Sequence, residues 1–293
     1  MKNHQEEFYP AALTISASDS GGTSGIQADL RTFNAAGIYG CSAITAIAAQ
    51  SPRQTAAFQP LDAALVKDEI ESVLSAIAIK AVKVGMTANA DIAGTVAELL
   101  KKHKLPVIAA PVMFGANGSS PADENTMTAV QNKILPLADM IIVNLPEAEY
   151  LTRRKLKNEK DYADAAMLLA NANKSNVLLI SEHAAGNRVG NIAVLDKKLY
   201  LLSHPPLGDQ DEFTFCGMIC TLSSGITAMI AAGNSWKDAV ISAMAHLLGA
   251  MSETAHIGKN LDVMYPPLED YSRMVTIRSM QKNSESKGVV DGR

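Results

Sequence analysis

The stretch ALTISASDSGGTSGIQADLRTF, residues 12–33, joins a short apolar run to an amphipathic segment through a glycine-rich turn. The run at 12–17 is typical of a buried strand, and the apolar spacing in 26–33 predicts a helix. In the turn, residues 18–25, glycines allow a close backbone approach to a ligand, and the helix start supplies free N–H groups. No Gly-Lys-Ser or Gly-Lys-Thr follows, so this turn is not a Walker A loop. The stretch predicts a strand–loop–helix unit whose loop can meet a ligand.

The same alternation continues along the chain. Further apolar runs predict buried strands at 42–48, 80–85, 106–110, 140–144 and 176–181. Helical patterns lie between the strands, the clearest at 66–77 and 92–100. Strands that are apolar throughout suit a sheet covered on both faces, so we predict an α/β fold with a doubly wound, mostly parallel sheet and helices on both faces. Such sheets bind ligands at the carboxyl ends of their strands.

The pattern changes after Ser181. Residues 189–203 alternate around Asp196, Lys197 and Lys198, which predicts an antiparallel hairpin on the edge of the sheet. Two apolar helices follow, Cys220–Ala232 and Ser235–Ser252.

Composition bounds the class of protein. The chain has 293 residues, 47% of them hydrophobic, with a net charge of −4 and three cysteines. We expect one α/β domain over 1–265 and a polar, disordered tail over 266–293. The net charge does not indicate a basic surface for nucleic acid, and no apolar run is long enough to span a membrane. The polar N-terminus and the lack of a disulfide framework favour a cytoplasmic protein.

Several blocks together resemble the hydroxymethylpyrimidine (phosphate) kinases of thiamine biosynthesis, in the ribokinase-like superfamily. They occur in family order and span about residues 11–253. Beyond the opening stretch, the blocks are YGCSAITAIAAQ (39–50), KVGM (83–86), PVM (111–113), LPLADMIIVNLPEAE (135–149) and CTLSSG (220–225).

The resemblance implies a site for a small aminopyrimidine. Gln50 matches the glutamine that binds the pyrimidine, and an amide offers both a donor and an acceptor to such a ring. Asp29 matches the aspartate that helps to hold the hydroxymethyl end. Met86 and Val112 match apolar pocket positions, and Ser24 stands at a pocket position where the family has alanine.

The resemblance also implies phosphoryl transfer from ATP with Mg²⁺. Cys220 matches the catalytic cysteine that deprotonates the hydroxymethyl group, and a helix N-terminus would lower the pKa of its thiol. Gly217 is retained from the anion hole that precedes this cysteine. Asn144 and Glu147 match the Asn-x-x-Glu motif that orders Mg²⁺ and phosphates through water. Members commonly dimerise, so we expect a homodimer.

Departures from the family cluster on the nucleotide side. Ile219 replaces an anion-hole glycine, which we interpret as a loss of backbone freedom and close approach, and Ala110 replaces a metal-serving aspartate. The family's next lysine has no counterpart in 114–118, and its Lys-Gly-Gly stretch appears as Ile-Ser-Glu at 180–182. An acidic run at 209–212 would disfavour a polyphosphate.

Three interpretations stay open. The first is a working kinase for hydroxymethylpyrimidine or its phosphate. The second is a degenerate homologue, weak or inactive, that binds a pyrimidine-like or pyridoxal-like ligand or a protein partner. The third, ranked last, is a kinase for pyridoxal or another alcohol, since pyridoxal kinases usually carry aspartate where Cys220 stands. The sequence does not say whether Lys83 or Arg188 replaces the missing lysines.

Overall fold

A computed structural model describes residues 8–113, 122–207 and 215–280. Its centre is a ten-stranded sheet of order β12-β9-β8-β7-β6-β5-β4-β1-β2-β3, in which the strands from β2 to β7 pair in parallel. The strands are β1 (Ala11–Asp19), β2 (Tyr39–Ser51), β3 (Gln54–Pro60), β4 (Ile79–Val84), β5 (Val107–Ala109), β6 (Met140–Asn144), β7 (Asn176–Ala185), β8 (Arg188–Leu195), β9 (Lys198–His204) and β12 (Thr276–Ser279).

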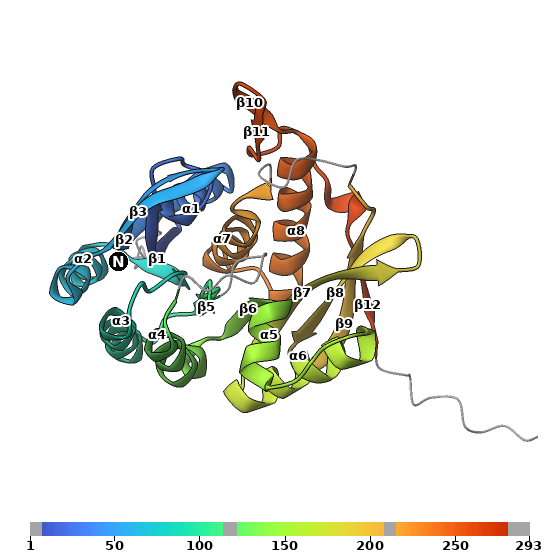
Figure 1. Ribbon diagram of the computed structural model, residues 1–293, viewed down its shortest axis with the longest axis horizontal. Helices are drawn as coiled ribbons and strands as arrows, with labels where there is room; N and C mark the ends of the chain where they lie inside the picture. The colour runs from blue at the N-terminus through green and yellow to red at the C-terminus, as the bar shows by residue number, and fades with distance from the viewer. Residues whose placement is uncertain (1–7, 114–121, 208–214, 281–293) are drawn as a thin grey trace, which may run out of the picture.

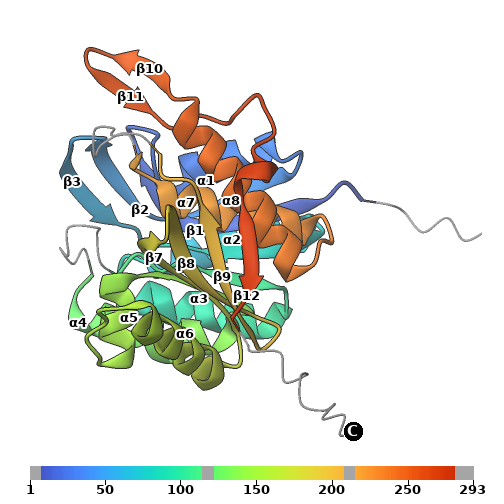
Figure 2. The same ribbon diagram turned by 90° about the vertical axis from the view of Figure 1, so that its right-hand side faces the viewer.

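Helices cover both faces of this sheet, which confirms the predicted doubly wound α/β architecture (Figures 1 and 2). One face carries α2 (Ala63–Ala76), α3 (Ala90–His103), α4 (Glu124–Ala129), α5 (Leu145–Thr152) and α6 (Glu159–Asn173). The other face carries α1 (Gly25–Ala35), α7 (Met218–Ala231) and α8 (Trp236–Ser252). Among the helices of the described chain, none is long and apolar enough to cross a bilayer.

The central strands show why their sequences are apolar throughout. Alternate residues of one strand point to opposite faces, so both sets enter a core when both faces are covered. In β6, Ile141 and Val143 join the core under α3 and α6, whereas Met140 and Ile142 join the core under α7 and α8. Loss of either helix layer would therefore expose half of every central strand.

The edge of the sheet differs from its prediction. β8 and β9 form the expected hairpin, with Asp196 and Lys197 in left-handed turn conformations, but β12 pairs with β9 and becomes the edge strand. Residues 276–279 thus belong to the sheet, although the polar composition after Pro266 predicted a tail. Arg188 holds this segment, since Nη2 donates to the carbonyl oxygen of Met274 at 2.6 Å.

Two small hairpins lie away from the edge strand β12, at the top and upper left of Figure 2. β3 pairs with β2 beyond the helices, and its side chains are mostly exposed. A separate two-stranded sheet joins β10 (Ala255–Gly258) to β11 (Leu261–Val263). Neither hairpin has an apolar stripe that sequence periodicity could detect.

Candidate functional site

The loop after β1 is built around the carboxylate of Asp19. Its Oδ1 accepts from the backbone N–H of Gly21 at 2.8 Å, and its Oδ2 accepts from the N–H groups of Thr23 and Ser24 at 3.1 and 2.9 Å. Asp19 is only 3% exposed, so these bonds replace water for a buried charge. The loop is therefore held in one conformation before any ligand arrives, and sequence reasoning overlooked Asp19 as its organiser.

Gln50 and Ser24 lie side by side, as two members of one site should. The Nε2 atom of Gln50 donates to Ser24 Oγ at 3.3 Å, and its Oε1 accepts from Thr55 Oγ1 at 3.0 Å. Ser20 Oγ fixes the backbone of Gln50 from the other side, accepting from its N–H and donating to its carbonyl oxygen. The amide of Gln50 is thus oriented at the rim of the loop, although its role in binding a pyrimidine stays a prediction.

The N-terminus of α7 packs directly on this loop. Gly217 has φ +85°, and a Cβ atom there would lie 1.9 Å from the carbonyl oxygen of Thr23. Only glycine allows both this left-handed conformation and this approach. α7 begins at Met218, two residues earlier than predicted, because Gly217 ends the preceding segment.

Ile219 does not cost the backbone freedom that we expected it to cost. It lies inside the first turn of α7, with Gly217 rather than Ile219 in the left-handed region. A β-branched residue adopts helical φ and ψ without strain. The part of our interpretation that concerned φ freedom is therefore wrong at this position.

Asp29 lies beneath the loop in a fully buried polar cluster. Its Oδ1 accepts from Ser224 Oγ at 2.6 Å and from the ammonium of Lys83, and its Oδ2 accepts from Thr14 Oγ1 at 2.6 Å. Asp29 is 0% exposed and Lys83 1%. The structure therefore assigns both oxygens of Asp29 to the interior, and it engages Lys83 there as a counter-ion.

Cys220 joins this cluster to the loop. Its thiol sits at the backbone N–H of Gly25 and close to the charges of Lys83 and Asp29. Burial raises the pKa of the Cys220 thiol; the ammonium of Lys83 opposes that rise, and the carboxylate of Asp29 adds to it. Our expectation of a lowered pKa is wrong for this conformation, because the loss of water outweighs the helix terminus.

Met86 and Val112 follow β4 and β5 on the same side of the sheet. Thr45 Oγ1 donates to the carbonyl oxygen of Met86 at 2.7 Å, which ties Met86 to β2. Val112 has φ +26°, an uncommon conformation for a β-branched residue. Both side chains are half-buried, in keeping with pocket walls, and their contact with a ligand stays a prediction.

Asn144 and Glu147 form a capping box at the start of α5. Asn144 Oδ1 accepts from the Glu147 N–H at 2.9 Å, and Glu147 Oε2 accepts from the Asn144 N–H at 3.0 Å. Glu147 Oε1 accepts from the N–H of Met113 at 2.8 Å. Of the described residues, no three His, Cys, Asp or Glu side chains cluster as metal ligands. Both carboxylate oxygens of Glu147 thus accept from backbone N–H groups, and its contact with Mg²⁺ through water stays a prediction.

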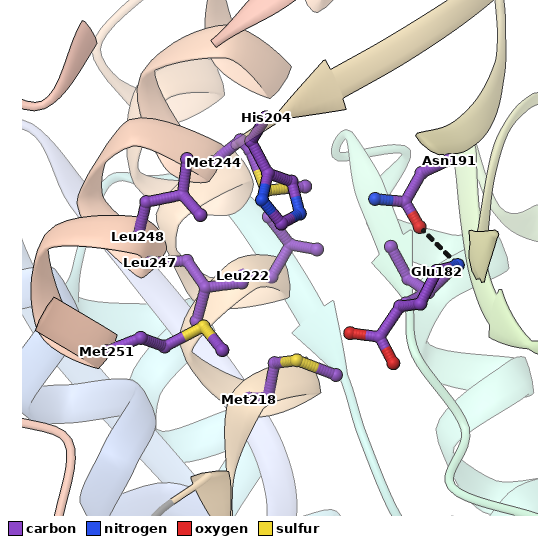
Figure 3. A pocket seen from close by; sticks show the side chains of 10 residues that line it. Glu182, Asn191, His204, Met218, Leu222, Met244, Leu247, Leu248 and Met251 are labelled. Carbon is purple, nitrogen blue, oxygen red and sulfur yellow. Dashed lines mark hydrogen bonds between the residues drawn. The ribbon is translucent and has the colours of Figure 1, made fainter. Parts of the chain in front are cut away.

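The region after β7 contains an apolar pocket. Its empty volume is about 310 Å³, open mouth included, and it lies between β7–β9 and the helices α7 and α8 (Figure 3). Ile180 and Glu182, which stand where the family has Lys-Gly-Gly, line its sheet side. The two cations considered as replacements are used elsewhere, since Lys83 pairs with Asp29 and Arg188 bonds to Ser203 and Met274.

Two of the departures that we noted, at 114–118 and 209–212, lie outside the described residues. Ala110 is buried at the end of β5, with its N–H donating to the carbonyl oxygen of Val84 at 2.8 Å.

Comparison with known proteins agrees with this geometry. A profile of the family described as phosphomethylpyrimidine kinase matches residues 19–264. A hydroxymethylpyrimidine/phosphomethylpyrimidine kinase of Rhizobium meliloti (strain 1021) is 34% identical over 242 residues, which cover 82% of this chain and 90% of that protein. A similar kinase of Haemophilus influenzae is 32% identical over 252 residues, covering 84% of this chain and 93% of that protein.

Solved structures give the same grouping. A crystal structure of phosphomethylpyrimidine kinase from Clostridium difficile 630 superposes with a TM-score of 0.73 at 32% identity, covering 82% of this chain and 99% of that one. A pyridoxal kinase from Staphylococcus aureus, in complex with AMP-PCP and pyridoxal, gives a TM-score of 0.78 at 25% identity, covering 94% and 100%. With the profile spanning residues 19–264 and the loop, the amide and the cysteine converging on one edge of a ribokinase-like sheet, the chain belongs to the phosphomethylpyrimidine kinase family.

Proposed function

We propose that the chain is a kinase that transfers the γ-phosphoryl group of ATP to hydroxymethylpyrimidine or its phosphate. The observation that carries this proposal is the junction of α7 with the loop after β1. Gly217 seats the helix on Thr23, which brings Cys220 to the backbone of Gly25, and Gln50 lies on the same loop through Ser24. The names of the relatives, which are kinases of this substrate class, support the same activity.

In this proposal the amide of Gln50 orients the aminopyrimidine, and Cys220 Sγ accepts the hydroxymethyl proton. The hydroxyl oxygen forms a bond to the γ-phosphorus while the bond to the leaving ADP oxygen breaks. Because burial raises the pKa of Cys220, its thiol must first release its own proton to solvent before Sγ can accept the hydroxymethyl proton. Lys83 favours that step, because its charge lowers the pKa of Cys220. Mg²⁺, contacted by Glu147 through water, would offset the charge of the phosphates.

A second candidate function is pyrimidine binding without phosphoryl transfer. The pocket after β7 favours it, because Ile180 and Glu182 present an apolar side chain and a carboxylate where the resemblance places a cation. Transfer depends on positioned positive charge, and loss of one such donor costs about 10²–10³ in rate.

ADP production separates the two candidates. MgATP is supplied with hydroxymethylpyrimidine and with its phosphate in separate reactions, at high protein concentration, and Cys220→Ala is the control. Turnover that Cys220→Ala abolishes supports the kinase. If no ADP forms while the pyrimidine still raises the melting temperature of the chain, the kinase proposal fails and the binding function stands.

A further inference from the structure

The side chain of Ser24 has a use other than the one that its position predicts. Ser24 is the N-cap residue of α1, and a serine there usually accepts a hydrogen bond from a backbone N–H of the first helical turn. Ser24 makes no such bond. Its hydroxyl instead donates to Asp19 Oδ2 at 2.8 Å and accepts from Gln50 Nε2 at 3.3 Å. Ser24 therefore joins the buried carboxylate of the loop to the amide at its rim.

Asp19 fixes the direction of these hydrogen bonds. An ionised carboxylate only accepts, so the single proton of the Ser24 hydroxyl is committed to Asp19. The Ser24 oxygen can then only accept from Gln50, and the atom of Gln50 beside it must be the NH₂ group. A flipped amide would set its own oxygen against the Ser24 oxygen with no proton between them. The orientation of the Gln50 amide thus depends on Asp19, through Ser24.

Thr55 holds the other end of the same amide without selecting its orientation. Its Oγ1 donates to Gln50 Oε1 at 3.0 Å, and it is the only hydrogen bond of that hydroxyl to a described residue. A hydroxyl both donates and accepts, so the Thr55 hydroxyl can rotate and accept from an NH₂ group instead. Loss of the Thr55 hydroxyl removes one bond, whereas loss of the Ser24 hydroxyl removes the directional preference.

The amide of Gln50 keeps one N–H and one oxygen lone pair for a ligand. An amide has two donors and two acceptor lone pairs, and the described residues use one of each. An aminopyrimidine has the complementary edge, because its amino group donates and the adjacent ring nitrogen accepts. In a pyrimidinone, an oxo group replaces the amino group, so that the oxygen accepts and the adjacent ring N–H donates. The two rings therefore present opposite orders of donor and acceptor to the same amide.

We propose that Ser24 is a specificity-determining residue, which holds the Gln50 amide in the orientation that accepts an aminopyrimidine and rejects the corresponding pyrimidinone. The proposal rests on the proposed function for the pose of the ring, since a hydroxymethyl group placed at Cys220 prevents the ring from turning over to suit the amide. A pyrimidinone in that pose sets donor against donor and acceptor against acceptor, and both pairs lose the bonds that they made with water. Alanine, which the family resemblance places at position 24, has no hydroxyl to impose this orientation.

Calorimetry without nucleotide tests the proposal with hydroxymethylpyrimidine and its analogue that has an oxo group in place of the amino group. We expect the native chain to bind the amino ring at least about tenfold more tightly than the oxo ring, because unpaired polar groups cost about 1–3 kcal/mol. Ser24→Ala should reduce this ratio of affinities to less than about threefold, since its amide is free to flip. Asp19 keeps its backbone N–H donors in Ser24→Ala, so the loop stays folded.

Thr55→Val is the matched control, because it removes a hydroxyl from the same amide and leaves Ser24 in place. It should lower both affinities alike and keep the ratio. A ratio near one in the native chain would overturn the proposal, as would a ratio that Ser24→Ala leaves unchanged or that Thr55→Val abolishes equally. A role of Ser24 in loop stability alone would lower both affinities together without changing their ratio.

The ratio is a measurement of binding, so its failure is distinct from failure of the kinase proposal. ADP formation by a chain whose ratio does not respond to Ser24→Ala would retain the kinase and reject the role of Ser24. The expected ratios in a chain that forms no ADP would retain the role of Ser24 and reject the kinase. If neither ring binds, the role of Ser24 is rejected as well.

Discussion

The two parts of the sheet edge differ in how their acidic residues are paired. At the loop after β1, Asp19 and Asp29 are buried. Backbone N–H groups donate to the Asp19 carboxylate, and the hydroxyl groups of Thr14 and Ser224 donate to the Asp29 carboxylate. At the pocket after β7, the carboxylate of Glu182 has no described partner and faces thioethers. The first arrangement fixes a shape, whereas the second leaves the carboxylate of Glu182, an exposed residue, to be solvated by water.

The contrast locates what has changed in this chain. Around the loop, Asp29, Gln50 and Gly217 match the residues that the family resemblance implies, and each is held by neighbours, whereas Ser24 departs from the family's alanine. The pocket after β7 replaces a cation and glycines with Ile180, Ser181 and Glu182. Both regions contact the start of α7, the loop through Gly217 and the pocket through Met218.

The largest expected effect comes from breaking the paired side. Asp29→Ala would leave the Lys83 ammonium buried without a counter-ion, which costs about 3–5 kcal/mol of unfolding free energy. The double variant Asp29→Asn with Lys83→Met removes both charges. Its loss of unfolding free energy should be smaller than the sum of the losses for Asp29→Asn and Lys83→Met made singly. Urea denaturation measures all of these variants. A loss below about 1 kcal/mol for Asp29→Ala would show that the ion pair does not hold the cluster together.

A smaller effect is expected at the junction of α7 with the loop. Gly217→Ala meets both a left-handed backbone and the carbonyl oxygen of Thr23, whereas Gly233→Ala meets φ +87° with nothing within 4 Å. The control should lose about 1–2 kcal/mol from backbone strain alone. Gly217→Ala should lose about 1–3 kcal/mol more, as an overpacked site does. Equal losses in urea denaturation would mean that the loop yields freely and that the junction is not rigid.

Sequence patterns predicted those elements whose residues are apolar in their own right. The strand at Met140–Asn144 has the predicted bounds, because every one of its apolar side chains enters a core. β3 and β12 escaped prediction, since most of their side chains are exposed and their order comes from the strand beside them. The capping box at Asn144 and Glu147 could have been recognised from its spacing alone.

Site residues that belong to a sequence motif were predicted. Contacts between residues far apart in the sequence, which only the fold brings together, were not. Gln50 and Ser24 meet as the resemblance implied. The pairing of Lys83 with Asp29 joins residues 54 positions apart, so no local pattern carries it. The raised pKa of Cys220 likewise depends on how many neighbours exclude water from the thiol, which sequence cannot count.

The next prediction concerns MgATP affinity after changes in the pocket after β7. Ile180→Lys with Glu182→Gly adds a cation, removes an anion and relieves the left-handed glutamate. We expect MgATP to bind about tenfold more tightly, which corresponds to about 1.4 kcal/mol. Glu98→Lys is the matched control, because it changes the net charge by the same amount on the other face of the sheet. An equal gain in the control, seen by calorimetry, would assign the effect to overall charge rather than to the pocket.

The smallest expected effect is a pH dependence of stability at Glu182. Glu182 is exposed as a residue, but the neighbours that partly desolvate its carboxyl raise the pKa of that group above about 4.3, its value in an unfolded chain. Between the two pKa values the folded chain binds more protons than the unfolded chain, so this group makes stability fall as pH rises through that window. Glutamine does not titrate, and the stability of Glu182→Gln relative to the native chain should therefore grow from pH 4 to pH 7. Urea denaturation at both pH values measures the difference, with Glu98→Gln as an exposed control. A difference that stays constant with pH would show that water reaches the Glu182 carboxylate freely, and the contrast with Asp19 and Asp29 would then rest on pairing alone.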